Sequence, residues 1–327
     1  REDYACVYMQ STSKLIAHVM NLAEKGVKLL SPALSFKFGK VYMMKTLLAM
    51  GRELGKNKAQ MAFAIMKGMA RMKEYSRDVE ELNQKVAEGL QKEEKAFIII
   101  TRTYNTADPV LNMKIPQKLI EMGYKVLTLA NIPAYDYDVS ADYPNMYWPF
   151  GQHVLAGAKL VRDMPNLYPI YITNHGCGPD TILSHYFTAE MQGKPYLHIE
   201  VDEHSSSVGV ITRLEAFINS LDNYDGKTAA PESAAKKAEP SGTEAGKLVL
   251  PNLYPYSQVL GEWFASKGIA TEILPASTQK SLEVGKQFTK SKEYVSLFSL
   301  LGDVFYHLQN TGEKSVKLWL PQSEGSE

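Results

Sequence analysis

The sequence predicts an α/β protein of the Rossmann-like or flavodoxin-like kind, with parallel sheets covered by helices on both faces and a long helical insertion. Short apolar runs alternate with segments of helical spacing from residue 96 onwards. Several runs, such as residues 97–101, have apolar residues at successive positions. Apolar side chains then lie on both faces of the strand, as in strands that helices cover on both sides. Apolar residues make up 45% of the 327 positions, which is enough for a large core.

Residues 96–221 are predicted to form the domain that carries the functional site. Expected strands lie at 97–101, 125–130, 168–173 and 196–201, and expected helices at 116–122, 150–162, 180–191 and 209–220. Strands that alternate with helices indicate βαβ units, whose crossovers are right-handed.

Residues 1–95 are predicted to be an N-terminal α/β remnant with a long helical region. We expect strands at 4–9 and 27–30, with a helix at 12–25 that ends at Gly26. A helical region follows from 40 to about 94 and breaks near 51–57, and its apolar residues Tyr75, Val79, Leu82, Val86 and Leu90 form an amphipathic stripe. We interpret its methionines as core filling rather than as a cofactor site.

Residues 222–246 are rich in Ala, Ser, Pro, Lys and Glu, and we expect a flexible linker there. Residues 247–327 are predicted to be a partial second α/β unit. Its expected strands lie at 248–250, 269–274 and 315–320, and its expected helices at 257–267 and 293–308.

The charge of the chain argues against nucleic acid and membranes as partners. Lys plus Arg and Asp plus Glu are both 36, so no net charge attracts an anionic polymer or lipid. No apolar run approaches the roughly 20 residues that span a bilayer. With only two cysteines and no signal region, we expect a cytoplasmic protein, and the missing initiator Met suggests excision from a longer one.

The most informative segment is Asn174-His175-Gly176-Cys177-Gly178-Pro179-Asp180, which follows an expected buried strand and begins a helix. Ligands of open α/β sheets bind at such carboxyl ends. The glycines permit close approach of the backbone, and the helix N-terminus is expected to lower the pKa of the Cys177 thiol. A ligand or nucleophile on one hand, and a small buried cysteine in a glycine turn on the other, remain equal alternatives.

Other polar residues are weaker candidates. His198, Glu200 and Asp202 alternate along one strand, which permits a metal site but favours a solvated edge or a hydrogen-bonded strand end. His204 is the best acid/base candidate among them. Cys6 by itself is best explained as a packed thiol, and a turn explains the loop of Asn105, Asp108 and Pro109. The chain has no Walker loop, G-x-G-x-x-G after a strand, G-x-S-x-G or H-E-x-x-H.

Four groups of segments, read together, resemble the 2-hydroxyacyl-CoA dehydratase family, and most closely its large fused acyl-CoA dehydratase/activase-related proteins. The resemblance covers most of residues 1–221 and, more weakly, 247–327. The segments are Ala107-Asp108-Pro109 with Leu111-Asn112-Met113-Lys114-Ile115-Pro116, Met146-Tyr147-Trp148 with Gly151-Gln152, Thr173 to Asp180, and Val201-Asp202-Glu203-His204-Ser205 with residues 211–217.

The resemblance implies stacked α/β domains around an oxygen-sensitive [4Fe–4S] or related iron–sulfur cluster, in proteins of anaerobic metabolism. An ATP-dependent activase supplies a low-potential electron, which enables loss of water from an acyl-CoA substrate. Cys177 and Cys6 match family cysteines, although Val7 replaces the usual Pro after Cys6, and a further cysteine is expected before Arg1. Tyr294 and Ser326 stand where the family has cysteines, so a second metal site in residues 247–327 is not expected.

Three functional hypotheses follow. In the first, the chain is part of a dehydratase or reductase, incomplete by itself. Cys177 and Cys6 then bind the iron, the backbone of Gly176 and Gly178 surrounds the cluster sulfurs, and His204 and Asp202 are catalytic groups in the pocket. In the second, it is a non-catalytic scaffolding module. In the third, Cys177 is a nucleophile with His175, His185 or His204 as base. A second copy of the chain is a further candidate partner.

Overall fold

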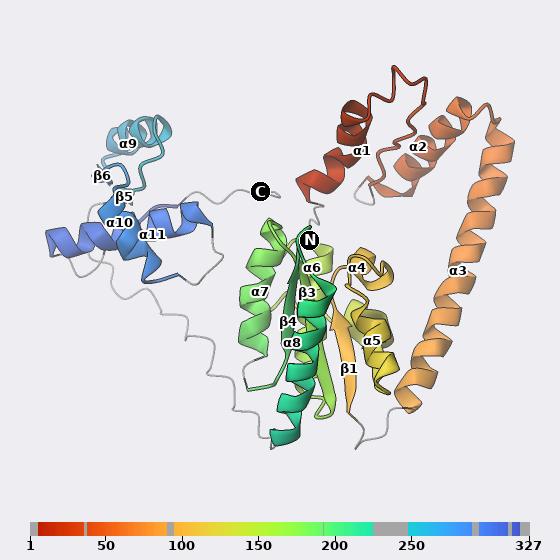
Figure 1. The fold of residues 1–327 in the computed structure, drawn as a ribbon. Helices are drawn as coiled ribbons and strands as arrows, with labels where there is room; N and C mark the ends of the chain where they lie inside the picture. The colour runs from red at the N-terminus through yellow and green to blue at the C-terminus, as the bar shows by residue number, and fades with distance from the viewer. Residues whose placement is uncertain are drawn as a thin grey trace. The chain divides into compact units, whose positions relative to one another are not determined.

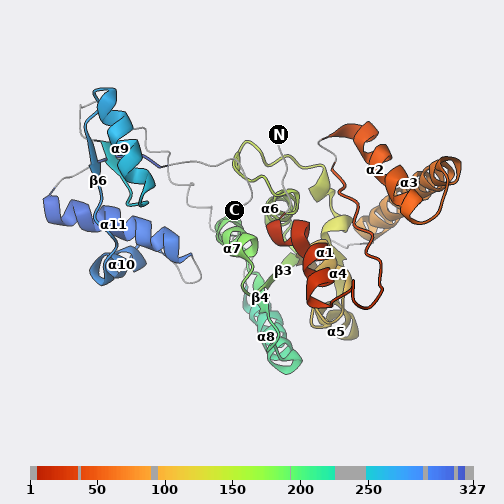
Figure 2. The same ribbon diagram turned by 90° about the horizontal axis from the view of Figure 1, so that it is seen from above.

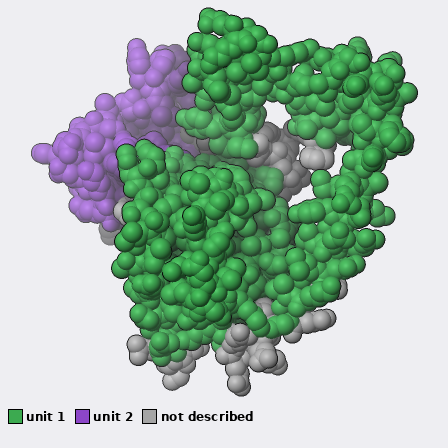
Figure 3. Space-filling view, turned by 45° about the vertical axis from the view of Figure 1, so that its right-hand side comes forward, with its two compact units in different colours: residues 1–231, 325–327 green, residues 232–324 purple. Residues whose placement is uncertain are grey.

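The computed structural model describes residues 6–35, 38–89, 95–191, 193–224, 248–289, 294–312 and 316–320. The chain divides into two compact units, residues 1–231 with 325–327 and residues 232–324, which Figure 3 distinguishes by colour. None of the helices in the described part of the chain has the length and apolar content that a membrane crossing needs.

The first unit is built on a four-stranded parallel sheet, which confirms the predicted fold class. Its strands are β1 (Ala96–Ile100), β2 (Lys125–Thr128), β3 (Leu167–Asn174) and β4 (Leu197–Val201). They lie in the order β2-β1-β3-β4, and every neighbouring pair is parallel. β1 and β3 are the central strands, and all five residues of β1 are buried, as their unbroken apolar run predicts.

Helices cover both faces of this sheet (Figures 1 and 2). α6 (Pro149–Arg162) and α7 (Gly178–Glu190) lie on one face, and α5 (Ile115–Glu121) and α8 (Ser207–Ser220) on the other. Successive residues of β1 enter opposite cores because side chains alternate along a strand: Ile98 and Ile100 pack with α6 and α7, and Phe97 and Ile99 pack with α5 and α8. The sheet therefore separates two hydrophobic cores.

The described residues between 6 and 89 contain helices but no strand, although we predicted strands at 4–9 and 27–30. α1 (Val7–Val19) occupies part of the strand expected at 4–9, and residues 27–30 form no regular element. Tyr and Val favour strands, but Val7 to Val19 form one uninterrupted helix. The long helical region is confirmed, with its break: α2 (Gly39–Glu53) is followed by α3 (Lys58–Glu88).

Short helices complete the first unit. α4 (Thr103–Ala107) follows β1 directly, and the 3₁₀ turns η1 (Leu129–Asn131), η2 (Pro133–Tyr135) and η3 (Leu221–Asn223) follow β2 and α8. α3 is tied to this region, because Asn83 hydrogen-bonds to Asn131 at 2.8 Å and to the carbonyl of Ala130.

The second unit contains a smaller parallel sheet of β5 (Leu248–Leu250), β6 (Thr271–Ile273) and β7 (Lys317–Leu318), in the order β6-β5-β7. Its helices are α9 (Tyr256–Ser266), α10 (Gln279–Lys286) and α11 (Val295–Thr311), of which α10 was not predicted. Most of the predicted linker, the Ser291-Lys292-Glu293 segment and residues 324–326 lie outside the described residues.

Candidate functional site

The strand order creates a topological switch point between β1 and β3. From β1 the chain moves to β2 on one side, and it then returns to place β3 on the other side of β1. The connections at the carboxyl ends of β1 and β3 therefore run in opposite directions, and open α/β sheets bind their ligands at such a point. Both Arg102, after β1, and the Asn174–Cys177 turn, after β3, lie at this edge.

A buried arginine holds the candidate cysteine and the first turn of the following helix together. The Nε of Arg102 donates a hydrogen bond to Asp180 Oδ1 at 2.8 Å, and its Nη2 donates to Cys177 Sγ at 2.8 Å. The guanidinium carbon lies 4.1 Å from the centre of the Phe150 ring. The Arg102 and Asp180 side chains are only 9% and 5% exposed, so this is a desolvated ion pair with a thiol attached to it.

A second polar group links the same two strands. Asn105 Nδ2 donates to Thr101 Oγ1 at 3.1 Å and to Asn174 Oδ1 at 3.3 Å, and Asn174 Nδ2 donates to the Tyr104 hydroxyl at 3.1 Å. Asn105 is fully buried, and its Oδ1 has no hydrogen-bond partner among the residues that the structure describes. We predicted that a turn alone explains this loop. The structure gives Asn105 a further role, because its side chain connects the ends of β1 and β3.

The turn after β3 presents Cys177 at the start of α7. Gly176 has a φ of +68°, a left-handed conformation that glycine adopts without strain. The amide of His175 donates to Val201 O at 2.9 Å, and the amide of Asn174 donates to Asp180 Oδ2 at 2.9 Å. Cys177 is the N-cap residue, Gly178 is the first helical residue, and Pro179 lies in the first turn. These contacts fix the backbone on both sides of the thiol.

The electrostatics of Cys177 differ from the sequence expectation. Burial raises the pKa of the Cys177 thiol, and the neighbouring Asp180 carboxylate raises it further. The Arg102 guanidinium acts in the opposite direction but does not outweigh them, although it donates to the sulfur. The expectation of a lowered pKa at this helix start is therefore wrong for the metal-free thiol, because half-burial beside a carboxylate dominates.

The alternating polar residues of β4 are engaged in hydrogen bonds. His198 Nε2 lies 2.8 Å from Thr173 Oγ1, and Glu200 Oε1 lies 2.7 Å from His175 Nδ1. β4 is an edge strand of the sheet, so these pairs match the hydrogen-bonded strand end that we favoured over a metal site. His175, a candidate base for Cys177, is thereby paired with a carboxylate.

Asp202 and His204 lie in the turn after β4. Asp202 Oδ1 accepts hydrogen bonds from Ser205 Oγ at 2.7 Å and from the His204 amide at 3.0 Å. The Ser205 hydroxyl is the main reason that the pKa of Asp202 is lowered. The His204 side chain is 84% exposed. A local turn accounts for Asp202, and the catalytic roles of both residues stay predictions.

Cys6 stands immediately before α1 as its N-cap residue, rather than at the end of a strand, and it is partly exposed. Among the described residues, no three His, Cys, Asp or Glu side chains form a group that could hold a metal ion. That Cys6 and Cys177 bind one cluster stays a prediction.

The sequence analysis missed Arg102, the residue that contacts both Cys177 and Asp180. A signal was present: Arg102 is the first charged residue after the apolar run 96–100, and residues that directly follow a central strand lie at the switch point. The strand order that identifies β1 as a switch-point strand is not visible in one sequence.

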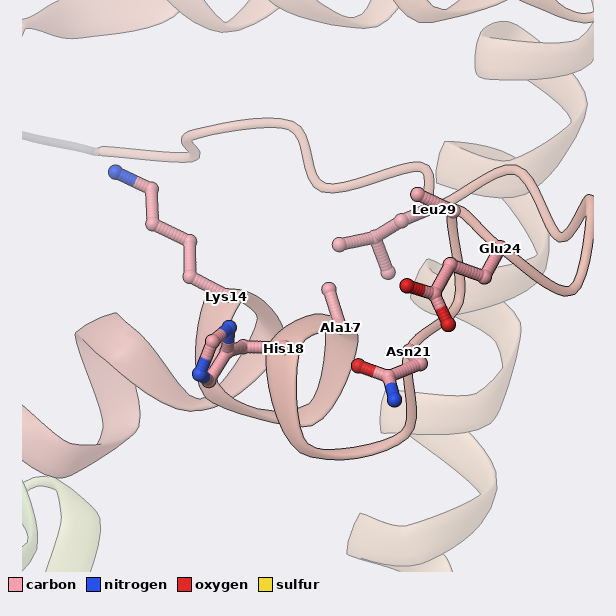
Figure 4. A pocket seen from close by; sticks show the side chains of 7 residues that line it. Lys14, Ala17, His18, Asn21, Glu24 and Leu29 are labelled. Carbon is pink, nitrogen blue, oxygen red and sulfur yellow. The ribbon is translucent and has the colours of Figure 1, made fainter.

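Two depressions lie elsewhere, on the N-terminal helices. One of about 420 Å³ is lined by Lys14, Ala17 and His18 of α1, and by Asn21, Ala23, Glu24 and Leu29 of the turn after it. Figure 4 shows these side chains around an open hollow between the helix and its own loop. It contains none of the predicted site residues.

The fold and the site define an open parallel α/β protein whose polar residues meet at a switch point. Residues 1–132 match the family model described as "CoA enzyme activase uncharacterised domain". This match fits the activase- and dehydratase-related proteins that the sequence resembles, and it includes Cys6, Arg102 and Asn105 but ends before Cys177. No curated protein and no solved structure matches the chain.

Proposed function

We propose that this chain is the cluster-bearing part of an activase-driven dehydratase or reductase. Cys177 would supply one thiolate ligand to an iron–sulfur cluster at the carboxyl edge of the first sheet. The hydrogen bond from Arg102 Nη2 to Cys177 Sγ at the switch point carries the proposal. A guanidinium beside sulfur stabilises its anionic form, which is the form that binds iron.

The match over residues 1–132 supports the activase-related part of this proposal. Acyl-CoA as substrate, an ATP-dependent activase as electron donor, and loss of water as the reaction come from the resemblance and remain proposals.

At the carboxyl edge of the first sheet, this chain offers one ligand for such a cluster. Cys177 offers a soft sulfur that is only partly buried. Iron–sulfur clusters are commonly held by four thiolates, whereas the sequence has two cysteines. Cys177 would hold one iron, Cys6 is the second candidate, and the remaining ligands would come from outside this sequence.

A bound cluster would supply one-electron chemistry at low potential. The residues of this chain would set its surroundings. Arg102 keeps one N–H on the Cys177 sulfur while Asp180 fixes the guanidinium, and hydrogen bonds to ligand sulfur tune a cluster. Asn105 and Asn174 hold the ends of β1 and β3 together, so the sulfur keeps a defined position.

Anaerobic reconstitution of the full chain with iron, sulfide and an added small thiol, which can fill the ligand positions that this sequence leaves open, tests the proposal. We expect bound iron and a charge-transfer absorption band in the native sequence, and loss of both in Cys177→Ala. Thr181→Ala is a matched control, because Thr181 Oγ1 bonds to the Cys177 carbonyl without touching the sulfur. Absence of iron from the native chain, or equal iron in Cys177→Ala, would refute cluster binding at this thiol.

Cys6→Ala separates the two cysteines. If Cys6 is the second ligand, the variant loses iron as Cys177→Ala does. If iron is lost only from Cys177→Ala, the cluster has Cys177 as its one ligand from this chain and the role predicted for Cys6 is wrong.

A further inference from the structure

The middle of α3 is uncovered although it carries large apolar side chains. Met66, Met69, Met72 and Tyr75 are each more than 60% exposed, so the prediction that the methionines of this region fill a core is wrong for these three. In the described part of the chain, Met61 near one end of α3 lies against Gly51 of α2, and Val86 near the other end packs against the core of the sheet. Ile65 and Val79 between them are half-buried. Exposed apolar residues gathered on one element mark an interaction surface.

One set of α3 residues, apolar except for Gly68, follows a heptad repeat, whereas Phe63, Met66 and Met69 lie off it. The residues of this set alternate in steps of four and three, and average about 3.5 residues per turn, which is the spacing of a coiled-coil seam. The seam positions are Met61, Ile65, Gly68, Met72, Tyr75, Val79, Leu82 and Val86. Of these, residues 65–82 lie between the two packed ends of the helix.

Charge is segregated along α3. Residues 58–73 contain the basic residues Lys58, Lys67, Arg71 and Lys73 and no acidic residue. Residues 74–86 contain the acidic residues Glu74, Asp78, Glu80 and Glu81 against the basic Arg77 and Lys85. The sign of the net charge changes between Lys73 and Glu74, at the middle of the helix.

This distribution opposes the dipole of the helix itself. A helix is stabilised by acidic residues near its N-terminus and basic residues near its C-terminus, whereas α3 has no acidic residue in its first turn. Ion pairs within α3 use part of this charge: Arg71 pairs with Glu74, and Arg77 pairs with Asp78 at 3.5 Å and with Glu81 at 3.8 Å. The side chains of Arg71, Arg77, Asp78 and Glu81 are at least 60% exposed, so these pairs add little stability and do not explain the segregation.

We propose that α3 pairs with α3 of a second copy of this chain in an antiparallel coiled coil. Antiparallel pairing places the basic half of each helix beside the acidic half of the other, whereas parallel pairing would place like charges together. An antiparallel pair has a two-fold axis, and the charge pattern places it between residues 73 and 74. The seam positions are symmetric about the same point. Around it Met72 faces Tyr75 of the second copy, Gly68 faces Val79, and Ile65 faces Leu82.

The flanking positions add a reciprocal ion pair. Arg71 and Asp78 each precede a seam residue, Met72 and Val79, and lie on opposite sides of the two-fold centre, within two residues of equal distance from it. In the antiparallel pair Arg71 of each copy meets Asp78 of the other. This pairing does not depend on whether Cys177 binds iron.

Sedimentation equilibrium of the full chain, over a range of concentrations, tests the proposal. Met72→Glu buries a carboxylate in the seam and is expected to weaken dimerisation at least about tenfold. Met66→Glu is the matched control, because Met66 is 62% exposed against 64% for Met72 but lies off the seam, and we expect less than about a twofold change. A chain that stays monomeric, or equal effects of both variants, would overturn the proposal.

A charge exchange tests the direction of the pair. Arg71→Glu is expected to weaken the dimer, and Arg71→Glu with Asp78→Arg is expected to restore it, because the reciprocal pair is rebuilt with opposite signs. A parallel dimer would show no such rescue, and that result would overturn the antiparallel arrangement. Far-UV circular dichroism of each variant confirms that α3 remains helical.

Discussion

Arg102 and Asp180 form a buried ion pair on which the candidate cysteine depends. The desolvation of the Arg102 guanidinium is offset by Asp180 and by the sulfur of Cys177, and the net effect raises the pKa of Arg102. Arg102 is therefore charged at every pH of interest. Asp180 also accepts from the amide of Asn174, so the pair fixes the turn that presents the thiol.

Removal of one partner is expected to destabilise the protein strongly. Arg102→Met leaves the Asp180 carboxylate buried and unpaired, which costs about 3–5 kcal/mol in the free energy of unfolding. Urea denaturation measures the loss. In the double variant Arg102→Met, Asp180→Leu we expect a large part of it to be recovered, because no charge remains unpaired. Simple addition of the two single losses would show that the residues are not coupled.

Lys194 is a second buried charge, at the opposite end of the sheet from the carboxyl edge. It is 5% exposed, its ammonium donates to the carbonyl of Met164, and the Tyr168 ring centre lies 5.7 Å away. Burial lowers the pKa of Lys194 from 10.5 to about 8, and Asp163 opposes this shift only weakly.

The protein is expected to become more stable as the pH rises from about 8 to 10. In this window Lys194 loses its proton in the folded chain but keeps it in the unfolded chain, whose pKa is near 10.5. The unfolded state then binds more protons, so the free energy of unfolding increases with pH, by at most about 1.4 kcal/mol per pH unit. Guanidinium denaturation at pH 7 to 10 measures it. Lys194→Met should lack this increase, and an equal increase in both proteins would contradict the assignment to Lys194.

At the scale of elements, the interior strands were predictable and the polar or terminal elements were not. β1 and β3 are buried on both faces, so continuous apolar runs mark them in the sequence. α10 was missed because its sequence, QKSLEVGK, has only two large apolar residues. The same reasoning found Cys177, through a glycine turn after a buried strand, but not Arg102, which touches it only because β1 and β3 are neighbours.

The crossing of α10 and α11 depends on two glycines. A Cβ on Gly302 would lie 2.0 Å from the carbonyl oxygen of Ser281, and one on Gly285 would lie 1.8 Å from that of Phe298. Both obstacles are backbone atoms, which move only if the helices separate. The close approach of these helices therefore requires residues without side chains.

Alanine at this crossing is expected to destabilise the second unit, despite its higher helix propensity. Gly302→Ala should cost about 1–3 kcal/mol by overpacking. Gly261→Ala, in α9 of the same unit, has its nearest neighbour at 3.5 Å and should instead gain about 0.5–1 kcal/mol from helix propensity. Thermal unfolding measures both variants. If Gly302→Ala is as stable as Gly261→Ala, the helices do not cross at this closeness.

At the scale of the whole molecule, both units use one arrangement of strands. In each, the first strand is central, the second pairs on one side, and the third pairs on the other, as the orders β2-β1-β3 and β6-β5-β7 show. The two sheets differ in the length of the strands, since β5 has three residues and β1 has five. The periodicity of the sequence predicted both units as α/β, but the strand order required the structure.

The arginine at the carboxyl edge of the first sheet and the sulfur that it contacts are 75 residues apart in the chain. The chain between Arg102 and Cys177 must first form β2, which pairs on one side of β1, and then return so that β3 pairs on the other side. Only then does the Cys177 thiol contact Arg102. Contacts of such long sequence separation form late and slow the folding of a domain. The time at which Cys177 becomes protected from alkylation during refolding should therefore report when β1 and β3 have paired.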